Sequence, residues 1–309
     1  MILSLRLLFK MYLLFSNSSF RNWIAEPQIN WKPKLGKGVF DVLVGTTFLD
    51  QRNEGLAQSA SGFSSEGLMK NLAAGTTRTT ATNYYSQYRY NAIFGRINYN
   101  LNRKYIINIT GRRDGSSRFG PGKQFANFGA AGLGWIFSKE NFIQKALPFL
   151  SFGKLRASYG TSGNDQIGDY QYLDAYTSSG IYQGGVGLTP VRLSNPDFAW
   201  EINKKLEAAI DLGFMQDRIL LAVSWYRNRS SNQLVGFPLA PTTGFASIQG
   251  NFPATIQNTG VEVELEAAII QRKDLSWTAS FNLSIPRNKL IAFPDIETFP
   301  VYVNQYVVG

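Results

Sequence analysis

Three glutamates at alternate positions are the first candidates for chemistry in this sequence of 309 residues. Glu262, Glu264 and Glu266 lie in the run VEVELEA, so a strand would place all three on one face. Alternate strand residues are roughly 6.5–7 Å apart, which suits the two carboxylates of an inverting glycosidase, and a carboxylate row also suits calcium. We favour a solvated wall in which neighbouring Arg and Lys side chains pair with these glutamates, because the sequence indicates no pocket that would raise a carboxyl pKa.

The composition narrows the chemistry further. The sequence has no Cys and no His, which excludes disulfides, thiolate zinc sites and cysteine nucleophiles, together with the Ser-His-Asp triad. The formal net charge is +10, but the basic residues are spread singly and form no nucleic-acid footprint. We therefore predict no catalytic residue, no metal site, no cofactor and no nucleic-acid partner.

A second candidate is the charged segment RRDGSSRFG, whose cations could hold an anionic substrate. Its seven candidate residues are Arg112, Arg113, Asp114, Gly115, Ser116, Ser117 and Arg118. We favour a structural turn, in which Asp114 and Gly115 begin a tight reversal and the two serines bond locally. Glycine-rich stretches elsewhere lack the GxxxxGK[ST] pattern of a phosphate loop and are assigned to ordinary loops.

A third candidate is a set of tyrosines in one long connecting segment: Tyr170, Tyr172, Tyr176 and Tyr182. Exposed loop aromatics often bind ligands, and tyrosine rings can stack on sugars. The same rings could pack the segment or contact a partner protein, and the sequence leaves these alternatives open.

The elements that position these residues are predicted to be strands. From Leu275 to Ser284, apolar and polar residues alternate strictly, and Val261 to Ile269 repeats the pattern with glutamates on the polar face. Further alternating stretches occur at 93–101, 105–112, 154–159, 206–214 and 219–225. With less regular strands at 20–32, 38–48 and 125–137, we count about ten strands. Segment 138–147 predicts one short helix with Ser138 as its N-cap.

Two architectures produce such alternation: a soluble β-sandwich and a membrane barrel with lipid outside and a polar lumen inside. The best alternating runs last about nine residues, close to the length that crosses a membrane, and their apolar faces carry no charge. Short links follow Leu101, Phe214 and Ile270, whereas long segments span 50–84, 114–124, 161–202 and 229–259. Short turns at one end and long loops at the other are typical of outer-membrane barrels. We predict an all-β, antiparallel transmembrane β-barrel with long extracellular loops.

Six segments, in order and at matching spacing, resemble the SusC/RagA family of TonB-linked outer-membrane transporters. They are RRDGSSRFG (112–120), NFGAAGLGWIFSKENF (127–142), LRASYGTSGNDQIGDYQY (155–172), NPDFAWE (195–201), PLAPTTGF (238–245) and NTGVEVELEA (258–267). The resemblance covers residues 90–290 and extends more weakly to about residue 20. It implies an outer-membrane importer of oligosaccharides, peptides or other large nutrients.

The resemblance also implies partners: the TonB complex, a SusD-like surface lipoprotein as a lid, and outer-membrane lipid around the barrel. Family members carry a carboxypeptidase-like domain, a TonB-contacting segment and a plug before the barrel, and large barrels have roughly 22 strands. We therefore expect 1–309 to be one partial barrel domain from the C-terminal half, with the plug and carboxypeptidase-like domains absent and TonB contacted through a missing N-terminal part.

Two alternatives remain. A secreted soluble β-sandwich that binds carbohydrate would fit the alternation, but it would tolerate charges on the faces that are apolar here. An outer-membrane barrel enzyme is disfavoured because the sequence offers no His and no paired nucleophile and base. We expect that these residues alone do not transport.

Overall fold

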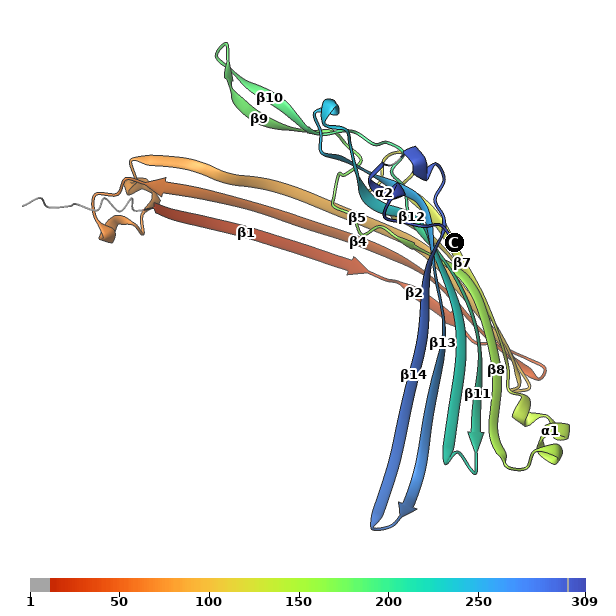
Figure 1. The fold of residues 1–309 in the computed structure, drawn as a ribbon. Coiled ribbons are helices and arrows are strands. Elements are labelled where there is room, and N and C mark those ends of the chain that lie inside the picture. The colour runs from red at the N-terminus through yellow and green to blue at the C-terminus, as the bar shows by residue number, and fades with distance from the viewer. Residues whose placement is uncertain (1–11, 299) are drawn as a thin grey trace, which may run out of the picture. The chain divides into compact units, whose positions relative to one another are not determined.

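The computed structural model describes residues 12–298 and 300–309, and its main elements are long β-strands (Figure 1). The chain divides into two compact units. One contains residues up to Ala25 and Phe48–Arg89, and the other contains Glu26–Thr47 and Tyr90–Gly309. Two strands, β4 (Gly38–Ser61) and β5 (Thr77–Leu101), contribute residues to both units. Within the described ranges, no helix is long and apolar enough to span a membrane.

In the first unit, β1 (Tyr12–Ala25) pairs antiparallel with the second half of β4, from Tyr12 opposite Ser61 to Ala25 opposite Phe48. The 3₁₀ turns η1 (Glu66–Leu68) and η2 (Leu72–Ala74) lie between β4 and β5. The prediction of one loop over 50–84 is therefore wrong, because only 62–76 lies outside strands. These strand ends are rich in Ser, Gly and Thr, so their sequence lacks the apolar face from which a strand can be predicted. They form strands because their backbones pair with neighbouring strands.

In the second unit, every long strand pairs antiparallel with its neighbours, in the order β4, β5, β6, β7, β8, β11, β12, β13, β14. The short strands β2 (Gln28–Trp31) and β3 (Lys34–Leu35) pair with β4. The remaining long strands are β6 (Tyr105–Ser116), β7 (Phe125–Trp135), β8 (Leu150–Asn164), β11 (Glu201–Phe214), β12 (Ile219–Pro238), β13 (Ser247–Arg272) and β14 (Leu275–Ala292). Figure 1 shows β11 to β14 side by side. The predicted all-β, antiparallel fold is confirmed. The main path from β1 to β14 has ten strands, close to the predicted number, but the predicted strand 20–32 is divided between β1 and β2.

Three of the four connections at one end of strands β5 to β14 in the second unit are short, and the fourth, 136–149, contains η3 and α1. Short turns occupy 102–104, 215–218 and 273–274, as predicted. The prediction of the long segments is partly wrong. Strands β12 and β13 extend through most of 229–259, and only 239–246 connects them. The segment between β8 and β11 contains a separate hairpin of β9 (Ala175–Tyr182) and β10 (Gly185–Arg192).

Helices are short. The segment after β7 forms a 3₁₀ turn, η3 (Phe137–Lys139), and a helix, α1 (Asn141–Ala146), whose N-cap is Glu140 and not the predicted Ser138. The turns η4 (Pro241–Thr243) and η5 (Ile296–Thr298) and the helix α2 (Pro300–Val303) complete the described helical elements.

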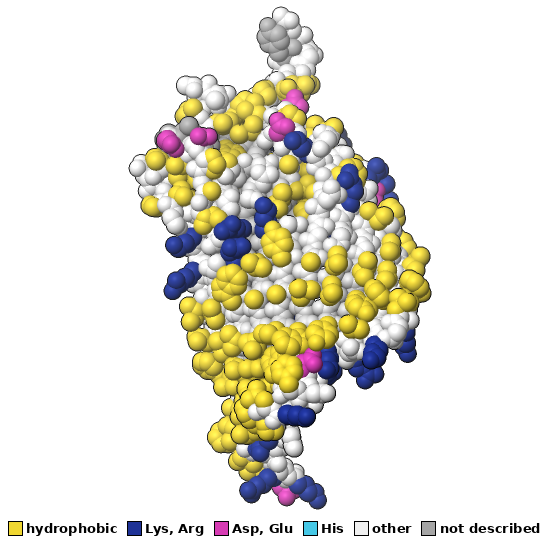
Figure 2. Space-filling view, turned by 90° about the vertical axis from the view of Figure 1, so that its right-hand side faces the viewer, with side chains coloured by type: hydrophobic (Ala, Val, Ile, Leu, Met, Phe, Trp, Pro, Cys, Tyr) yellow, Lys and Arg dark blue, Asp and Glu magenta, His cyan; other side chains and the backbone are white. Residues whose placement is uncertain are grey.

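Register aligns side chains of one kind across neighbouring strands. One row consists of Leu133, Ala157, Ala208, Trp225, Val261 and Ile285, which lie opposite one another from β7 to β14. These apolar side chains are open to the surroundings: Leu133 is 61% exposed and Ile285 is 51% exposed. Figure 2 shows hydrophobic side chains gathered over a broad area of one face. A sheet with so much apolar surface uncovered by protein requires an apolar medium against it.

Candidate functional site

The polar face of the second unit carries a cavity of about 890 Å³. Its lining includes Arg156, Ser158, Glu207, Tyr226, Glu262 and Glu264, from strands β8, β11, β12 and β13. Strand alternation places these side chains on the face opposite the apolar row. The same strands thus present one apolar surface and one polar surface, as a barrel wall between lipid and a lumen would.

Arg156 lies opposite Ala209 and links the carboxylates on either side of that residue. It forms ion pairs with Glu207 and Asp211, both on β11, and its Nε lies 3.5 Å from the Asp211 Oδ2 atom. These side chains are partly exposed, so the pairs orient the groups more than they stabilise the fold.

The three glutamates of β13 have a different environment from the predicted one. Glu262 lies opposite Ser224 and Ser284, and Glu264 lies opposite Ala222 and Asn282. None of the ion pairs in the described part of the chain includes Glu262, Glu264 or Glu266. The predicted pairing with Arg and Lys is therefore wrong, because the positions opposite the three glutamates on β12 and β14 carry uncharged side chains, Leu220 and Ser280 in the case of Glu266. Glu262 and Glu264 do line the cavity, and their role toward a substrate stays a prediction.

The structure corrects the prediction for RRDGSSRFG. Arg112 to Ser116 continue strand β6, with Asp114 opposite Ala126 and Gly115 opposite Phe125, so no reversal begins at Asp114–Gly115. The chain reverses over 117–124, and this turn is closed by a hydrogen bond from the Ser116 N–H to the Gln124 carbonyl (3.0 Å). The local serine bond is present at Ser116, whose Oγ accepts from the Arg118 N–H (3.3 Å).

The two leading arginines of this segment are held by contacts within the chain. Arg112 bonds to Asp114 and to the Tyr90 hydroxyl, and its guanidinium lies 5.4 Å from the centre of the Phe94 ring. Arg113 donates to Asn127 (3.1 Å) and lies over the Phe125 ring. These contacts support the structural role, whereas binding of an anion by either arginine remains untested.

Arg118 connects this segment to the loop after β8. Its Nε donates to Asp169 Oδ1 (3.0 Å), and its Nη1 donates to the Asp165 carbonyl (3.1 Å). The Arg118 and Asp169 side chains are about four-fifths buried, so this charge-assisted pair is stronger than an exposed one. It fixes the path of the GTSGNDQIGDYQY segment against the end of β6.

Beside Arg118 lies an aromatic group that we call the loop-end cluster: Phe119, Phe128, Phe198 and Trp200. Phe119 and Phe198 are fully buried, and their ring centres are 6.1 Å apart in an edge-to-face arrangement. Trp200 lies 5.1 Å from Phe119 and donates its indole N–H to the Gln124 carbonyl (3.1 Å). Three of the six sequence motifs therefore meet in one small core at the end of the strands that carries the long connections.

Amide side chains hold the NPDFAWE segment to the β12–β13 hairpin. Asn195 donates to the Gln249 carbonyl (2.7 Å). Asn251 donates to the carbonyls of Ala199 (2.6 Å) and Asn232 (3.0 Å), and it accepts from the Ala199 N–H (2.8 Å). These bonds satisfy backbone groups that the irregular segment would otherwise leave unpaired.

The four candidate tyrosines occupy different settings. Tyr170 and Tyr172 are half-buried, and a Cβ on Gly120 would lie 3.0 Å from the Tyr172 ring, which indicates close packing there. Tyr176 is exposed on β9, where its hydrogen bond to Asp174 raises the Tyr176 pKa. Tyr182 ends the same strand. The structure thus favours packing for Tyr172, and substrate binding by these residues stays a prediction.

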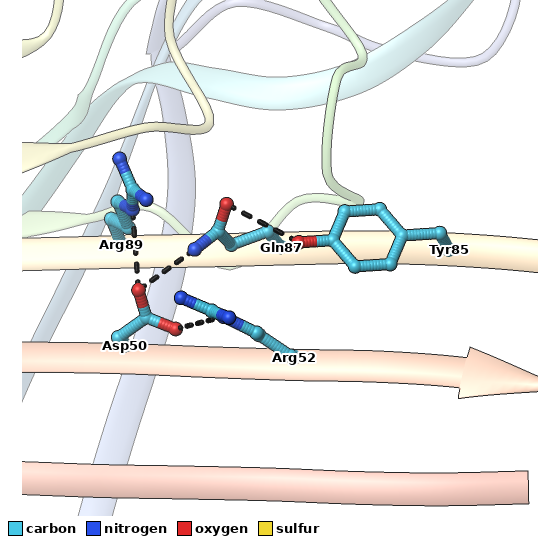
Figure 3. A network of polar contacts seen from close by, with 5 residues as sticks. All are labelled: Asp50, Arg52, Tyr85, Gln87 and Arg89. Atoms are coloured by element: carbon cyan, nitrogen blue, oxygen red, sulfur yellow. Dashed lines mark hydrogen bonds and ion pairs between the residues drawn. The ribbon is translucent and has the colours of Figure 1, made fainter.

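A polar network in the first unit lies outside the predicted sites (Figure 3). Asp50 is buried and accepts from Arg52 Nε (3.0 Å), Gln87 Nε2 (2.7 Å) and Arg89 Nε (3.2 Å), while Tyr85 contacts Gln87. The network links β4 to β5. Its signal in the sequence is the i, i+2 spacing of Asp50 with Arg52 and of Gln87 with Arg89, and only the first of these pairs lies within the predicted loop 50–84.

In the described part of the chain, no group of three His, Cys, Asp or Glu side chains is arranged to hold a metal ion.

Comparisons with known proteins agree with this architecture. A family model described as TonB dependent receptor-like, beta-barrel, matches residues 12–299. A TonB-dependent receptor of Formosa agariphila is 36% identical over 231 residues, covering 75% of this chain and 22% of the relative. The TonB-dependent receptor SusC of Bacteroides thetaiotaomicron is 29% identical, covering 85% of this chain and 26% of SusC.

Among solved structures, a chain of the RagAB peptide importer in its closed-closed state superposes with a TM-score of 0.82 at 26% identity. The match covers 92% of this chain and 31% of that chain. The chain thus spans 22% to 29% of the length of the curated relatives it matches. Because the family model covers nearly the whole sequence, the chain belongs to the TonB-dependent receptor-like β-barrel family of the outer membrane.

Proposed function

We propose that the protein imports a large nutrient, an oligosaccharide or a peptide, through a polar lumen to whose wall this sheet contributes. The observation that carries the proposal is the two-sided wall: a polar cavity on one face and an exposed apolar row on the other. The similar RagAB complex is described as a peptide importer, which supports peptides as one substrate class.

In this proposal the TonB complex supplies the energy, and a SusD-like surface lipoprotein covers the long connections. The names of the relatives, TonB-dependent receptor and SusC, support both partners. The family is one of receptors and transporters rather than enzymes, and we propose no chemistry at the glutamates. A turnover of oligosaccharide or peptide that disappeared in Glu262→Gln or Glu264→Gln would overturn this part.

Uptake by cells provides the test. The intact protein is expressed in an outer membrane, with and without TonB, and cells are offered defined mixtures of peptides and of oligosaccharides. We expect depletion of one class, only when TonB is present. Uptake that is equal without TonB contradicts the proposal.

The polar wall is tested by Glu262→Gln combined with Glu264→Gln. We expect slower uptake, because the change removes two unpaired charges from the cavity lining. Glu66→Gln, an exposed glutamate of η1, is the control. Surface abundance is measured for both variants, and equal uptake at equal abundance would exclude a role for these two carboxylates.

A further inference from the structure

The apolar face of the second unit contains a hollow of about 770 Å³. Its lining is almost wholly apolar and includes Leu133, Trp135, Leu155, Ala157, Ala208 and Trp225. These residues come from strands β7, β8, β11 and β12, all hydrogen-bonded neighbours.

The hollow follows from the register of small and large side chains. Ala157 lies directly opposite Ala208, so two neighbouring strands present only methyl groups at this level. Leu133 flanks Ala157 on one side, and Trp225 flanks Ala208 on the other. Two small residues between two large ones leave a groove floor with apolar walls.

A hydrogen-bonded polar group contacts two lining residues at the end of the hollow nearest the short turns. Glu140 accepts from Lys104 Nζ (3.0 Å), from the Tyr105 hydroxyl (2.8 Å) and from the Trp135 indole N–H (3.3 Å). Tyr105 and Trp135 line the hollow themselves. Such aromatics with one polar end are typical of the boundary between hydrocarbon and headgroups.

Basic residues lie in the two segments next to this polar group. Arg103 and Lys139 are exposed, and Lys139 Nζ donates to the Arg103 carbonyl (3.2 Å). With Lys104 they give three cations beside the single carboxylate of Glu140. The short turns of outer-membrane barrels face the periplasm, so this group lies at the level of the inner leaflet of the outer membrane.

We propose that the hollow binds one acyl chain of an inner-leaflet phospholipid, whose headgroup phosphate lies against the basic group of Arg103, Lys104 and Lys139. The hollow is continuous with the apolar row that faces lipid, so lipid is the medium that covers it. Charge complementarity at the turn end selects a headgroup with a phosphate. The inference rests on the outer-membrane location and not on the import proposal.

Retention of lipid tests the proposal. The intact protein is extracted from outer membranes in mild detergent, washed, and examined by native mass spectrometry. We expect one phospholipid to remain after the others are removed. Ala157→Phe combined with Ala208→Phe fills the groove floor and should reduce this occupancy to background. Ala131→Phe is the matched control, because Ala131 is exposed on the same face and lies outside the hollow.

Any other result excludes one part of the proposal: the site, the leaflet or the headgroup contact. Equal retention in the filled variant and the control, or no retained lipid in the wild type, would exclude the site. Retained lipopolysaccharide in place of phospholipid would exclude the leaflet assignment. Arg103→Gln combined with Lys139→Gln should weaken retention, and unchanged retention would exclude the headgroup contact. Heat-modifiable migration confirms folding, and the smaller change Ala208→Leu is used if the double variant does not fold.

Discussion

The strand wall of β6 to β14 and the loop-end cluster belong to the same unit, but apolar side chains are exposed in the wall and buried in the cluster. In the wall, Leu133 and Phe281 are 61% and 55% exposed. In the loop-end cluster, Phe119 and Phe198 are completely buried by protein. The wall is completed by lipid, whereas the cluster is a small core of the kind found in soluble proteins.

The difference in exposure indicates that the two regions are stabilised by different interactions. Strand pairing satisfies the backbone of the wall, and its apolar side chains gain their burial from the membrane. The long connections lie outside the membrane, so side-chain packing and amide bonds must hold them. The two regions should therefore respond to different substitutions.

The largest effect is expected in the loop-end cluster. Phe198→Ala removes a fully buried ring and should destabilise the packed connections by about 3–5 kcal/mol. Limited proteolysis and denaturant titration of the intact protein would measure this loss. Phe142→Ala, at an exposed position of α1, is the control. Similar losses in the two variants would show that the cluster is not a core.

The next effect distinguishes the two faces of β14. Phe281→Arg places a charge on the lipid face and should cost about 2–4 kcal/mol, whereas Thr278→Arg enters the polar face at little cost. The yield of heat-modifiable, folded protein in outer membranes is the measurement. Equal yields would contradict the assignment of the faces.

A smaller effect concerns the ion pair that joins the cluster to the loop after β8. Arg118→Gln leaves Asp169 without its charged partner and should destabilise this region by about 1–3 kcal/mol. Cleavage of segment 165–200 by protease should become faster, while the strands stay protected. Arg192→Gln, which removes different bonds of the same segment, helps to separate a general loosening from the specific pair.

The smallest effect is a pH dependence at the turn end of the wall. Hydrogen bonds from Lys104 and then Tyr105 lower the pKa of Glu140. A lowered folded-state pKa means that the contribution to stability is complete above the ordinary glutamate pKa, about 4.3, and is lost as the pH falls through the lowered value. Thermal melts between neutral and acidic pH should show this loss, and Glu140→Gln should flatten that part of the profile. A profile unchanged in Glu140→Gln would remove Glu140 from the account.

Much of the wall could be predicted from the sequence, because strict alternation such as Leu275 to Ser284 fixes both the strand and its faces. The ends of the strands could not. In 50–61 and 77–84 both faces are polar, so no hydrophobic period distinguishes these strands from a loop.

The candidate sites were only partly predictable. Alternation assigned the three glutamates to the polar face, but their unpaired state depends on which residues of β12 and β14 lie opposite, and that is a matter of register. The loop-end cluster brings Phe119 and Trp200 together across about 80 residues of chain, and no local pattern reports such a contact.

Cysteine accessibility tests the two-sided wall most directly, since the sequence contains no Cys and single cysteines introduced into it can be followed. Glu264→Cys and Leu265→Cys are neighbours on β13 whose side chains point to opposite faces. In outer membranes, a water-soluble maleimide should label Cys at position 264 and leave position 265 unlabelled, because a thiol that faces lipid stays protonated and out of reach of water. Position 265 should become labelled once the protein is denatured in detergent. Equal labelling of both positions by the water-soluble reagent would contradict a wall with lipid on one side and a polar lumen on the other.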